Sequence, residues 1–329
     1  MAECRKQITR AALAAAVLLA AVNLIACGPE SSASSTVDRT FTVSGPVRLE
    51  LENPSGNSRV TVGPPGEVRV HAEFRVHSWP WEDPGQTLKD LVANPPFSQQ
   101  DSLVRIGHAG RDTSQLSAEY SVIVPPDTQM RGVIGSGNLE VNGIAGPANF
   151  TVGSGNISAT AILSDTRAIV GSGNATLTDA QGRIDVTAGS GNVEVRGAKD
   201  EVRARTGSGN LRIEQPGANV EAEAGSGSIE VRGATADLRL RTGSGQVNVD
   251  GNPGPSSYWD IRATSGDVEL QVPSSASFRF YARSGSGDIN VTAASVTEET
   301  PGKHDFQARV GDGKARVEVE TSSGSVSLH

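Results

Sequence analysis

Four carboxylates gather in one stretch of the 329-residue sequence: Asp250, Asp260, Asp267 and Glu269. A pair of carboxyl groups on either side of a glycosidic bond can cleave it when one of them stays protonated to act as the acid. That chemistry requires carboxylates that are not held by arginine partners. A glycan-active enzyme is therefore one hypothesis for the function, and it depends on whether these acids stand unpaired.

The histidines and glycines do not favour other common chemistries. His71 and His77 share one face of an expected strand, but no acidic residue or third histidine accompanies them at ligand spacing, so we predict no metal site. The Gly-Ser-Gly turns lack the third glycine and the Lys-Ser/Thr pair of nucleotide-binding loops. Aspartate follows the turn glycine at only two turns, Asp267 and Asp288, which disfavours a repeated calcium site. We predict no cofactor.

Aromatic side chains are scarce, with 3 Trp, 3 Tyr and 7 Phe in the whole chain. Rings that reach the solvent stack on sugars and anchor protein interfaces. The candidate binding residues are Trp79, Trp81, Tyr258, Trp259 and Tyr281. The alternative is that these rings pack inside the protein, which is the commoner place for a large apolar side chain.

The first 26 residues have the parts of a bacterial export signal. Three basic residues precede an apolar run over 11–26, which is shorter than the roughly 18 residues that a membrane-spanning helix needs. The run ends in Leu-Ile-Ala-Cys-Gly, which is similar to a lipobox, so Cys27 is predicted to carry a lipid. We expect an extracytoplasmic, lipid-anchored protein of the cell envelope, on the outer membrane if the cell has one. The alternative is a buried cysteine in an N-terminal anchor helix.

Composition agrees with an exported protein that has no thiol chemistry. Cys4 lies in the segment to be removed and Cys27 would hold the lipid, so no disulfide or thiol nucleophile remains. The net charge of −8 disfavours a nucleic-acid partner. Residues 27–39 are rich in serine and are predicted to form a flexible tether.

Beyond residue 130 the sequence repeats. Ser-Gly followed by a polar residue recurs with its glycine at 137, 155, 173, 191, 209, 227, 245, 266 and 287, so most spacings are 18 residues and the last two are 21. Apolar and polar residues alternate on both sides of each turn, which indicates strands with one buried face. Each repeat is predicted as strand, loop, strand and a Gly-Ser-Gly-Asn corner.

Charged residues indicate how the repeats stack. In an antiparallel meander Arg205 would face Arg212, and like charges in that position destabilise a sheet. In a parallel stack, one column alternates in sign at every step: Arg167, Asp185, Arg203, Glu221, Arg239 and Asp260. We therefore predict an all-β fold, a parallel β-solenoid with coils of about 18 residues. One corner would carry a ladder of amides: Asn138, Asn156, Asn174, Asn192 and Asn210.

The flanking regions complete the expected organisation. The solenoid domain is predicted over 40–329, because alternation begins near residue 40. Residues 78–117 break the alternation and are predicted as an insertion with a short helix around 86–92. Strands at 306–310 and 315–321 are expected to cover the open end of the stack, since an exposed edge invites pairing with another chain.

The sequence resembles a bacterial family of β-strand-repeat proteins described as proposed adhesins. The resemblance is carried by the run from Tyr120 to Pro126, the sequence Ile134-Gly-Ser-Gly-Asn-Leu-Glu-Val141, the serial Ser-Gly units and the ending from Gly313 to Val326. The resemblance covers 40–329 apart from the insertion. It implies a right-handed parallel β-solenoid on the cell envelope. No catalytic residues belong to the family's motif, so the resemblance implies no enzyme.

Together these features predict a lipid-anchored, non-catalytic surface protein with an adhesive, binding or scaffolding role. Its expected partners are the membrane, through the lipid on Cys27, and a protein or glycan surface that the sequence does not name. The alternatives are a scaffold associated with envelope stress and, in a different class, the glycan-active enzyme on a β-helix.

Overall fold

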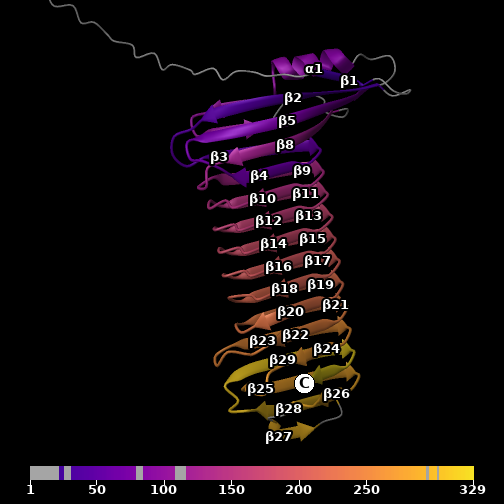
Figure 1. Cartoon of the computed structure of the whole chain (residues 1–329). Coiled ribbons are helices and arrows are strands. Elements are labelled where there is room, and N and C mark those ends of the chain that lie inside the picture. The colour runs from indigo at the N-terminus through magenta and orange to yellow at the C-terminus, as the bar shows by residue number, and fades with distance from the viewer. Residues whose placement is uncertain (1–21, 26–30, 79–83, 108–115, 294–295, 302–303) are drawn as a thin grey trace, which may run out of the picture.

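The computed structural model of the chain describes residues 22–25, 31–78, 84–107, 116–293, 296–301 and 304–329. Within them, strands stack one above another into a long rod, with β-strands on two sides and the single described helix at one end (Figure 1). The predicted all-β fold with long parallel sheets is confirmed.

Two sheets run the length of the rod, and each contains 15 of the described strands. Sheet A has, in spatial order, β1 (Val22–Ile25), β2 (Ser31–Thr42), β5 (Glu67–Ser78), β8 (Leu116–Val124), β4 (Ser58–Val62), β10 (Leu139–Asn142), β12 (Ile157–Thr160), β14 (Ala175–Thr178), β16 (Val193–Arg196), β18 (Leu211–Glu214), β20 (Ile229–Ala234), β22 (Val247–Gly251), β24 (Val268–Gln271), β30 (Val326–Leu328) and β26 (Ile289–Val291). Sheet B has β27 (Val296–Pro301), β28 (Asp305–Val310), β25 (Phe278–Ser286), β29 (Ala315–Ser323), β23 (Tyr258–Ser265), β21 (Leu238–Ser244), β19 (Val220–Ser226), β17 (Val202–Ser208), β15 (Ile184–Ser190), β13 (Thr166–Ser172), β11 (Ala148–Ser154), β9 (Gln129–Ser136), β3 (Arg48–Ser55), β7 (Leu103–Ile106) and β6 (Phe97–Gln100).

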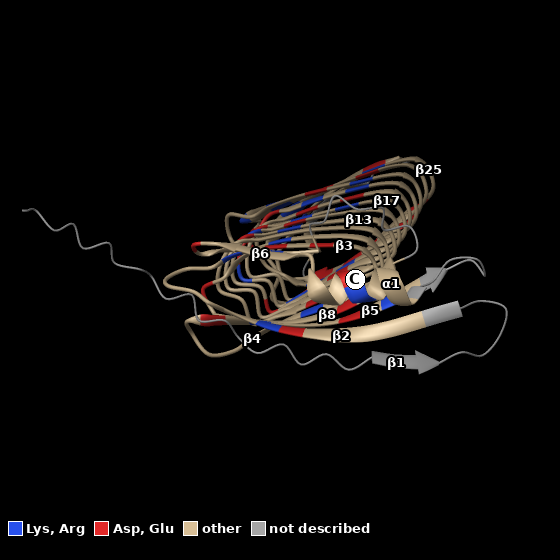
Figure 2. Cartoon of the chain, turned by 90° about the horizontal axis from the view of Figure 1, so that it is seen from above, with Lys and Arg blue, Asp and Glu red and all other residues tan. Residues whose placement is uncertain are grey.

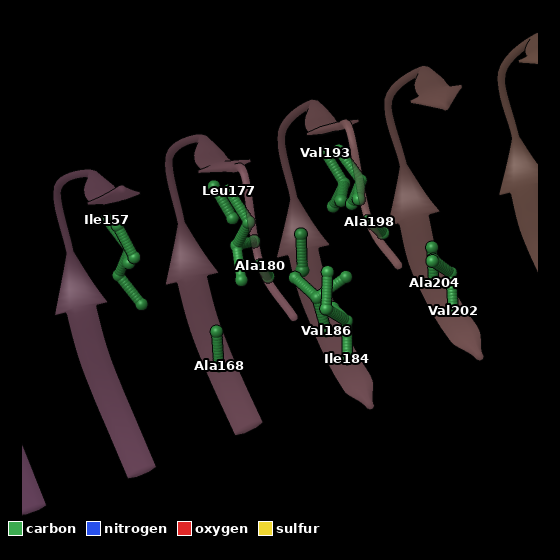
Figure 3. Packing of buried hydrophobic residues seen from close by; sticks show 14 of the residues in the cluster. Ile157, Ala168, Leu177, Ala180, Ile184, Val186, Val193, Ala198, Val202 and Ala204 are labelled. Carbon is green, nitrogen blue, oxygen red and sulfur yellow. The ribbon is translucent and has the colours of Figure 1, made fainter. Parts of the chain in front are cut away.

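The middle of the rod is built from in-register parallel pairs. In sheet A Val193 lies opposite Leu211, and in sheet B Val202 lies opposite Val220, so partners are one repeat apart in both sheets. Each coil therefore gives one strand to each sheet and turns a corner between them. Alternation places every second side chain between the sheets, as for Ile184 and Val186 (Figure 3).

The glycine corners bring the backbones of neighbouring coils close together. Gly191 has φ of +140°, and a Cβ on it would lie 1.9 Å from the carbonyl oxygen of Gly173 in the preceding coil. Only glycine allows this approach, which explains why the turn sequence repeats so strictly. A second corner, which the sequence pattern did not predict, has positive φ in successive coils at Gly143, Ala161, Asp179, Gly197, Gln215 and Gly233.

The N-terminal end of the rod differs from the prediction for 78–117. The expected helix is present as α1 (Pro84–Ala93), and it packs on β2 and β5. However, β7 lies inside the predicted insertion and pairs in parallel with β3, so it is an integral strand of sheet B. Its short run of alternating residues, Leu103–Ile106, was hidden between less regular segments.

The predicted tether also differs from the structure. Residues 31–39 belong to β2, which pairs in antiparallel fashion with β5 along its whole length. Serine and threonine are compatible with a strand near the end of a sheet when one face can be buried, and Val37 and Phe41 supply that face. Serine content alone therefore misled the prediction. The rest of the tether and the predicted signal segment lie outside the described residues, except for β1.

At both ends the coils do not follow the order of the chain. The coil of β3 and β4 lies between the coil of β7 and β8 and the coil of β9 and β10. In the same way, the last coil of the described chain, β29 with β30, lies between the coil of β23 and β24 and that of β25 and β26. The prediction that the strand at 315–321 covers the open end is therefore wrong; on sheet B, β28 and β27 lie outermost.

Candidate functional site

The predicted charge column lies on the outer face of sheet B. Arg203 pairs in register with both Asp185 and Glu221, and its Nε lies 3.1 Å from Oε2 of Glu221. The other members of the column are paired in register as well: Arg167 with Asp185, Glu221 with Arg239, and Arg239 with Asp260. Basic and acidic residues are interspersed along the stack (Figure 2). All these pairs join neighbouring coils in register, and Arg203 and Glu221 form an ion pair.

The corner asparagines are joined by hydrogen bonds. Oδ1 of Asn138 accepts hydrogen bonds from the backbone N of Asn156 at 3.0 Å and from its Nδ2 at 2.9 Å. The same oxygen-to-backbone bond links Asn156 to Asn174, Asn174 to Asn192 and Asn192 to Asn210. The row starts one coil earlier, at Asn57, which accepts from Asn138. These side chains are occupied in holding the corner.

The candidate aromatic residues lie in different environments in the structure. Trp259 is fully buried, and its Nε1 donates to the backbone oxygen of Ala236 at 2.8 Å. The prediction that Trp259 binds a partner is therefore wrong, because β23 turns this residue toward the core and its neighbour Tyr258 outward. Trp79, Trp81 and Cys27 lie outside the described residues.

Tyr258 and Tyr281 lie on the outer face of sheet B near the end of the rod that is far from β1 (Figure 1). They come from β23 and β25, and β29 runs between these two strands. Arg316 of β29 places its guanidinium carbon 5.0 Å from the ring centre of Tyr281 and 5.9 Å from that of Tyr258. The two rings and the cation form one cluster that spans three strands.

Glu318 completes this cluster. The hydroxyl of Tyr258 donates to Oε2 of Glu318, while Nε of Arg316 donates to Oε1 at 2.6 Å. Glu318 also lies in register with Tyr281 on one side and with Asp260 on the other. The carboxylate thus ties the tyrosine hydroxyl and the guanidinium together, and the cluster is held in place.

A hollow of about 290 Å³ opens beside the cluster, and we call it the end pocket. It is formed over β23, β29, β25 and β28. Its walls include one tyrosine ring and several charged groups: Tyr281, Asp260, Arg262, Arg283, Asp305 and Glu318. Tyr281 is half-buried and lines the hollow. The end pocket therefore offers a partly exposed ring beside a set of charged groups.

The hydrogen bonds of the cluster shift the pKa values of Glu318 and Tyr258 away from neutral pH. The hydrogen bond from Tyr258, together with Arg316, lowers the pKa of the Glu318 carboxyl below its ordinary value. The same hydrogen bond to Glu318, and to a smaller degree burial, raises the pKa of Tyr258. Glu318 is therefore a carboxylate and Tyr258 a neutral phenol throughout the physiological range.

The charges of this cluster speak against acid catalysis by Asp260; the other acids of the enzyme hypothesis, Asp250, Asp267 and Glu269, lie elsewhere, in β22 and at or next to β24. Asp260 and Glu318 lie side by side in register, as two carboxylates of a glycosidase would need to lie close together. Yet Arg262 donates to Asp260 at 2.8 Å, and Arg316 and Tyr258 occupy Glu318. A general acid needs a raised pKa, whereas the pKa of Glu318 is lowered. The arrangement suits binding better than acid catalysis.

A second hollow, of about 400 Å³, lies on sheet A near the opposite end of the rod. Its lining includes Arg59, His71 and Tyr120. Tyr120 is only 4% exposed, and His71 is bonded through Nδ1 to Asp38 at 2.7 Å. The phenol ring of Tyr120 is therefore not open to a ligand in this hollow. In the described part of the chain no group of His, Cys, Asp and Glu is arranged to hold a metal ion, and no helix is long and apolar enough to cross a membrane.

Sequence reasoning found Tyr258 and Tyr281 but missed Arg316 and Glu318. These two residues stand in a strand that the sequence placed at the end of the stack rather than between the tyrosines. The charges could have indicated the position of this strand. Glu320, two residues after Glu318, lies between Arg262 and Arg283 in one column of alternating sign.

Comparison with known proteins places the repeats in a family. The sequence profile named Toastrack DUF4097 matches residues 127–232 and 218–329, which together make up more than half of the chain. The chain belongs to the Toastrack family. The Toastrack matches cover the coils from β9 onward, and the structure extends the same two sheets over β3, β4, β7 and β8.

Solved structures with some similarity to this Toastrack protein come from three bacteria. They are a proposed cell adhesion protein of Clostridium sporogenes (9% identity, 88% of this chain and 97% of that chain covered, TM-score 0.19), a proposed adhesin of Bacteroides fragilis (11%, 89% and 97%, TM-score 0.33) and a proposed adhesin of Parabacteroides distasonis (10%, 89% and 97%, TM-score 0.28). None of the curated proteins matches the chain in sequence.

Proposed function

We propose that this Toastrack protein is anchored by a lipid on Cys27 to the outside of the bacterial cell envelope, and that it binds an external partner through the end pocket without catalysing a reaction. The rod would be a right-handed solenoid, the hand that parallel crossover connections nearly always take. Binding, rather than scaffolding by the flat faces, is favoured because the half-buried ring of Tyr281 lines the end pocket and the exposed ring of Tyr258 belongs to the same cluster.

The placement of the end pocket along the rod carries this proposal. With residues 1–26, and thus β1, removed, the chain would start at the end formed by β2 and α1, whereas Tyr258, Tyr281 and Arg316 lie toward the opposite end (Figure 1). A stack of 15 strands measures about 65 Å at the usual strand spacing. A lipid on Cys27, a few residues before β2, would hold the near end at the membrane, and the end pocket would face outward.

The anchor is tested by replacing its cysteine. In cell fractionation Cys27→Ser should release the protein from membranes or leave its precursor unprocessed, because no thiol then remains to receive the lipid. Cys4→Ser is the matched control, since that residue would be removed with the signal segment, and it should fractionate like the wild type. Membrane retention of Cys27→Ser in processed form would contradict the anchor.

The binding role is tested by photo-cross-linking in intact cells. A benzophenone amino acid replaces Gln307, an exposed residue in the wall of the end pocket, and a second variant carries it at Leu163, which is 47% exposed on the middle coils. We expect light-dependent adducts at Gln307 that are lost when Tyr281→Ala is added, and none of comparable yield at Leu163. The same adducts at both positions, or none at Gln307, would refute a binding role for this end.

A further inference from the structure

We propose that the end pocket binds an uncharged oligosaccharide. This inference rests on the proposed function, because it names the ligand of the same site. It is drawn from three properties of the pocket: a fixed ring, a set of paired charges and the size of the hollow.

The Tyr281 ring offers a stacking surface that is already ordered. Arg316 lies against it at 5.0 Å, and Glu318 in turn holds Arg316 by hydrogen bonds. A ring fixed in this way loses little freedom when a ligand arrives, which favours binding by stacking. The faces of sugar rings carry C–H groups that pack on such a ring, and their hydroxyls remain at the edge for polar contacts.

The charged groups of the pocket suit hydroxyls better than ions. Four carboxylates line it, from Asp260, Asp305, Glu318 and Glu320, together with the two guanidinium groups of Arg262 and Arg283. This excess of carboxylates repels a phosphate or an acidic ligand. Arg262 donates to Asp260 at 2.8 Å, so the carboxylate charge is partly balanced and a cationic ligand finds less attraction.

Arg262, Glu320, Arg283 and Asp305 lie opposite one another on four neighbouring strands, so the charges alternate across the pocket, and the Arg262 side chain is 51% exposed. A sugar hydroxyl both donates and accepts a hydrogen bond, so a row of alternating guanidinium and carboxylate groups can satisfy adjacent hydroxyls. A hollow of about 290 Å³ lies at the small end of the range for ligand pockets. It would take a short part of a glycan, and the remainder would continue over the sheet.

The test uses the full chain, purified in detergent, and uncharged six-unit oligosaccharides of glucose, mannose and N-acetylglucosamine as probes. Binding is followed by titration calorimetry. We expect at least one of them to bind, Tyr281→Ala to weaken that binding about 10-fold or more, and Tyr281→Phe to retain it, because the ring is kept. Leu163→Ala, an exposed position on the middle coils, serves as the control and should bind like the wild type.

If none of the probes binds, or if Tyr281→Ala binds as tightly as the wild type while melting at the same temperature, the pocket does not recognise a sugar of this class. Adducts at Gln307 to polypeptide alone would also overturn it, although the proposed binding role would stand. Absence of any adduct would remove the proposed function itself.

Discussion

At the scale of single residues, one step along a strand decides whether a side chain can act on a ligand. Tyr258 is 37% exposed, whereas Trp259 is fully buried, because neighbours in β23 point to opposite faces. Tyr281 reaches the end pocket for the same reason that Phe280 joins the core. The proposed binding at this end thus depends on which of two adjacent aromatic residues falls on the outer face.

The bond between Tyr258 and Glu318 predicts a dependence of stability on pH. The pKa of Glu318 is lowered in the folded protein, so its contribution is present above the ordinary carboxyl pKa and is lost as the pH falls through the folded value. Glu318→Gln should therefore lower the melting temperature at neutral pH, and the difference from the wild type should shrink in acid. Thermal melts over a pH series measure this. A difference that stays constant into strong acid would show that the carboxylate charge contributes nothing.

At the scale of elements, charge and volume explain why β29 lies between β23 and β25. Glu320 lies opposite both Arg262 and Arg283, which would otherwise face one another. On the inner face Val317 lies between Trp259 and Phe280 in register. Without it, these two large side chains would lie next to each other in the core. The opposite end uses the same device, because Glu50 of β3 lies between Arg105 and Arg131.

The glycine corner gives a second prediction at this scale. Gly191→Ala should destabilise the protein by about 2–3 kcal/mol, because alanine must adopt a strained φ and its Cβ would meet the oxygen of Gly173. Gly45→Ala is the matched control. Gly45 also has positive φ, at +78°, but a Cβ on it would meet nothing within 4 Å, so the cost should be about 1 kcal/mol.

Denaturant unfolding of the two variants measures the difference. Equal free energies of unfolding would mean that the corner tolerates a side chain, and the close stacking of glycines would then not be what maintains the repeat.

At the scale of the whole molecule, the rod is closed by aromatic clusters at its two ends. Phe74, Phe97 and Tyr120 lie with ring centres 6.1–6.4 Å apart at one end. Phe280 lies 6.3 Å from Phe278 and from Phe306 at the other. The middle coils bury one large ring, Phe150, and their core between the two sheets is otherwise filled by smaller side chains such as Ala204 and Ala222. Both aromatic clusters therefore fill places where the repeat is interrupted.

Intercalation of the last coil predicts how the end of the rod responds to truncation. Removal of residues 311–329 should expose 278–310 to hydrogen exchange, because β25 and β26 pair with β29 and β30 and not with the preceding coil. The middle coils, from 139 to 214, should stay protected. Continued protection of 278–310 would mean that β25 can dock directly on β23.

A point substitution tests the same arrangement without shortening the chain. Glu320→Arg should lower the melting temperature more than Glu320→Gln, because it would place three arginines in one column. Equal melting temperatures for the two variants would contradict the role of Glu320 as the separating charge.

Local periodicity in the sequence was enough to specify the repeating part of this protein. Register, corner glycines and the alternating column from Arg167 to Asp260 all follow from it, since each repeat contacts the next in the same way. The ends were settled by tertiary contacts alone. There, coils that are distant in sequence lie side by side, and the partner of a strand depends on volume and charge matches across long separations. For that reason Arg316 and Glu318, which complete the cluster with Tyr258 and Tyr281, could not be placed by spacing alone.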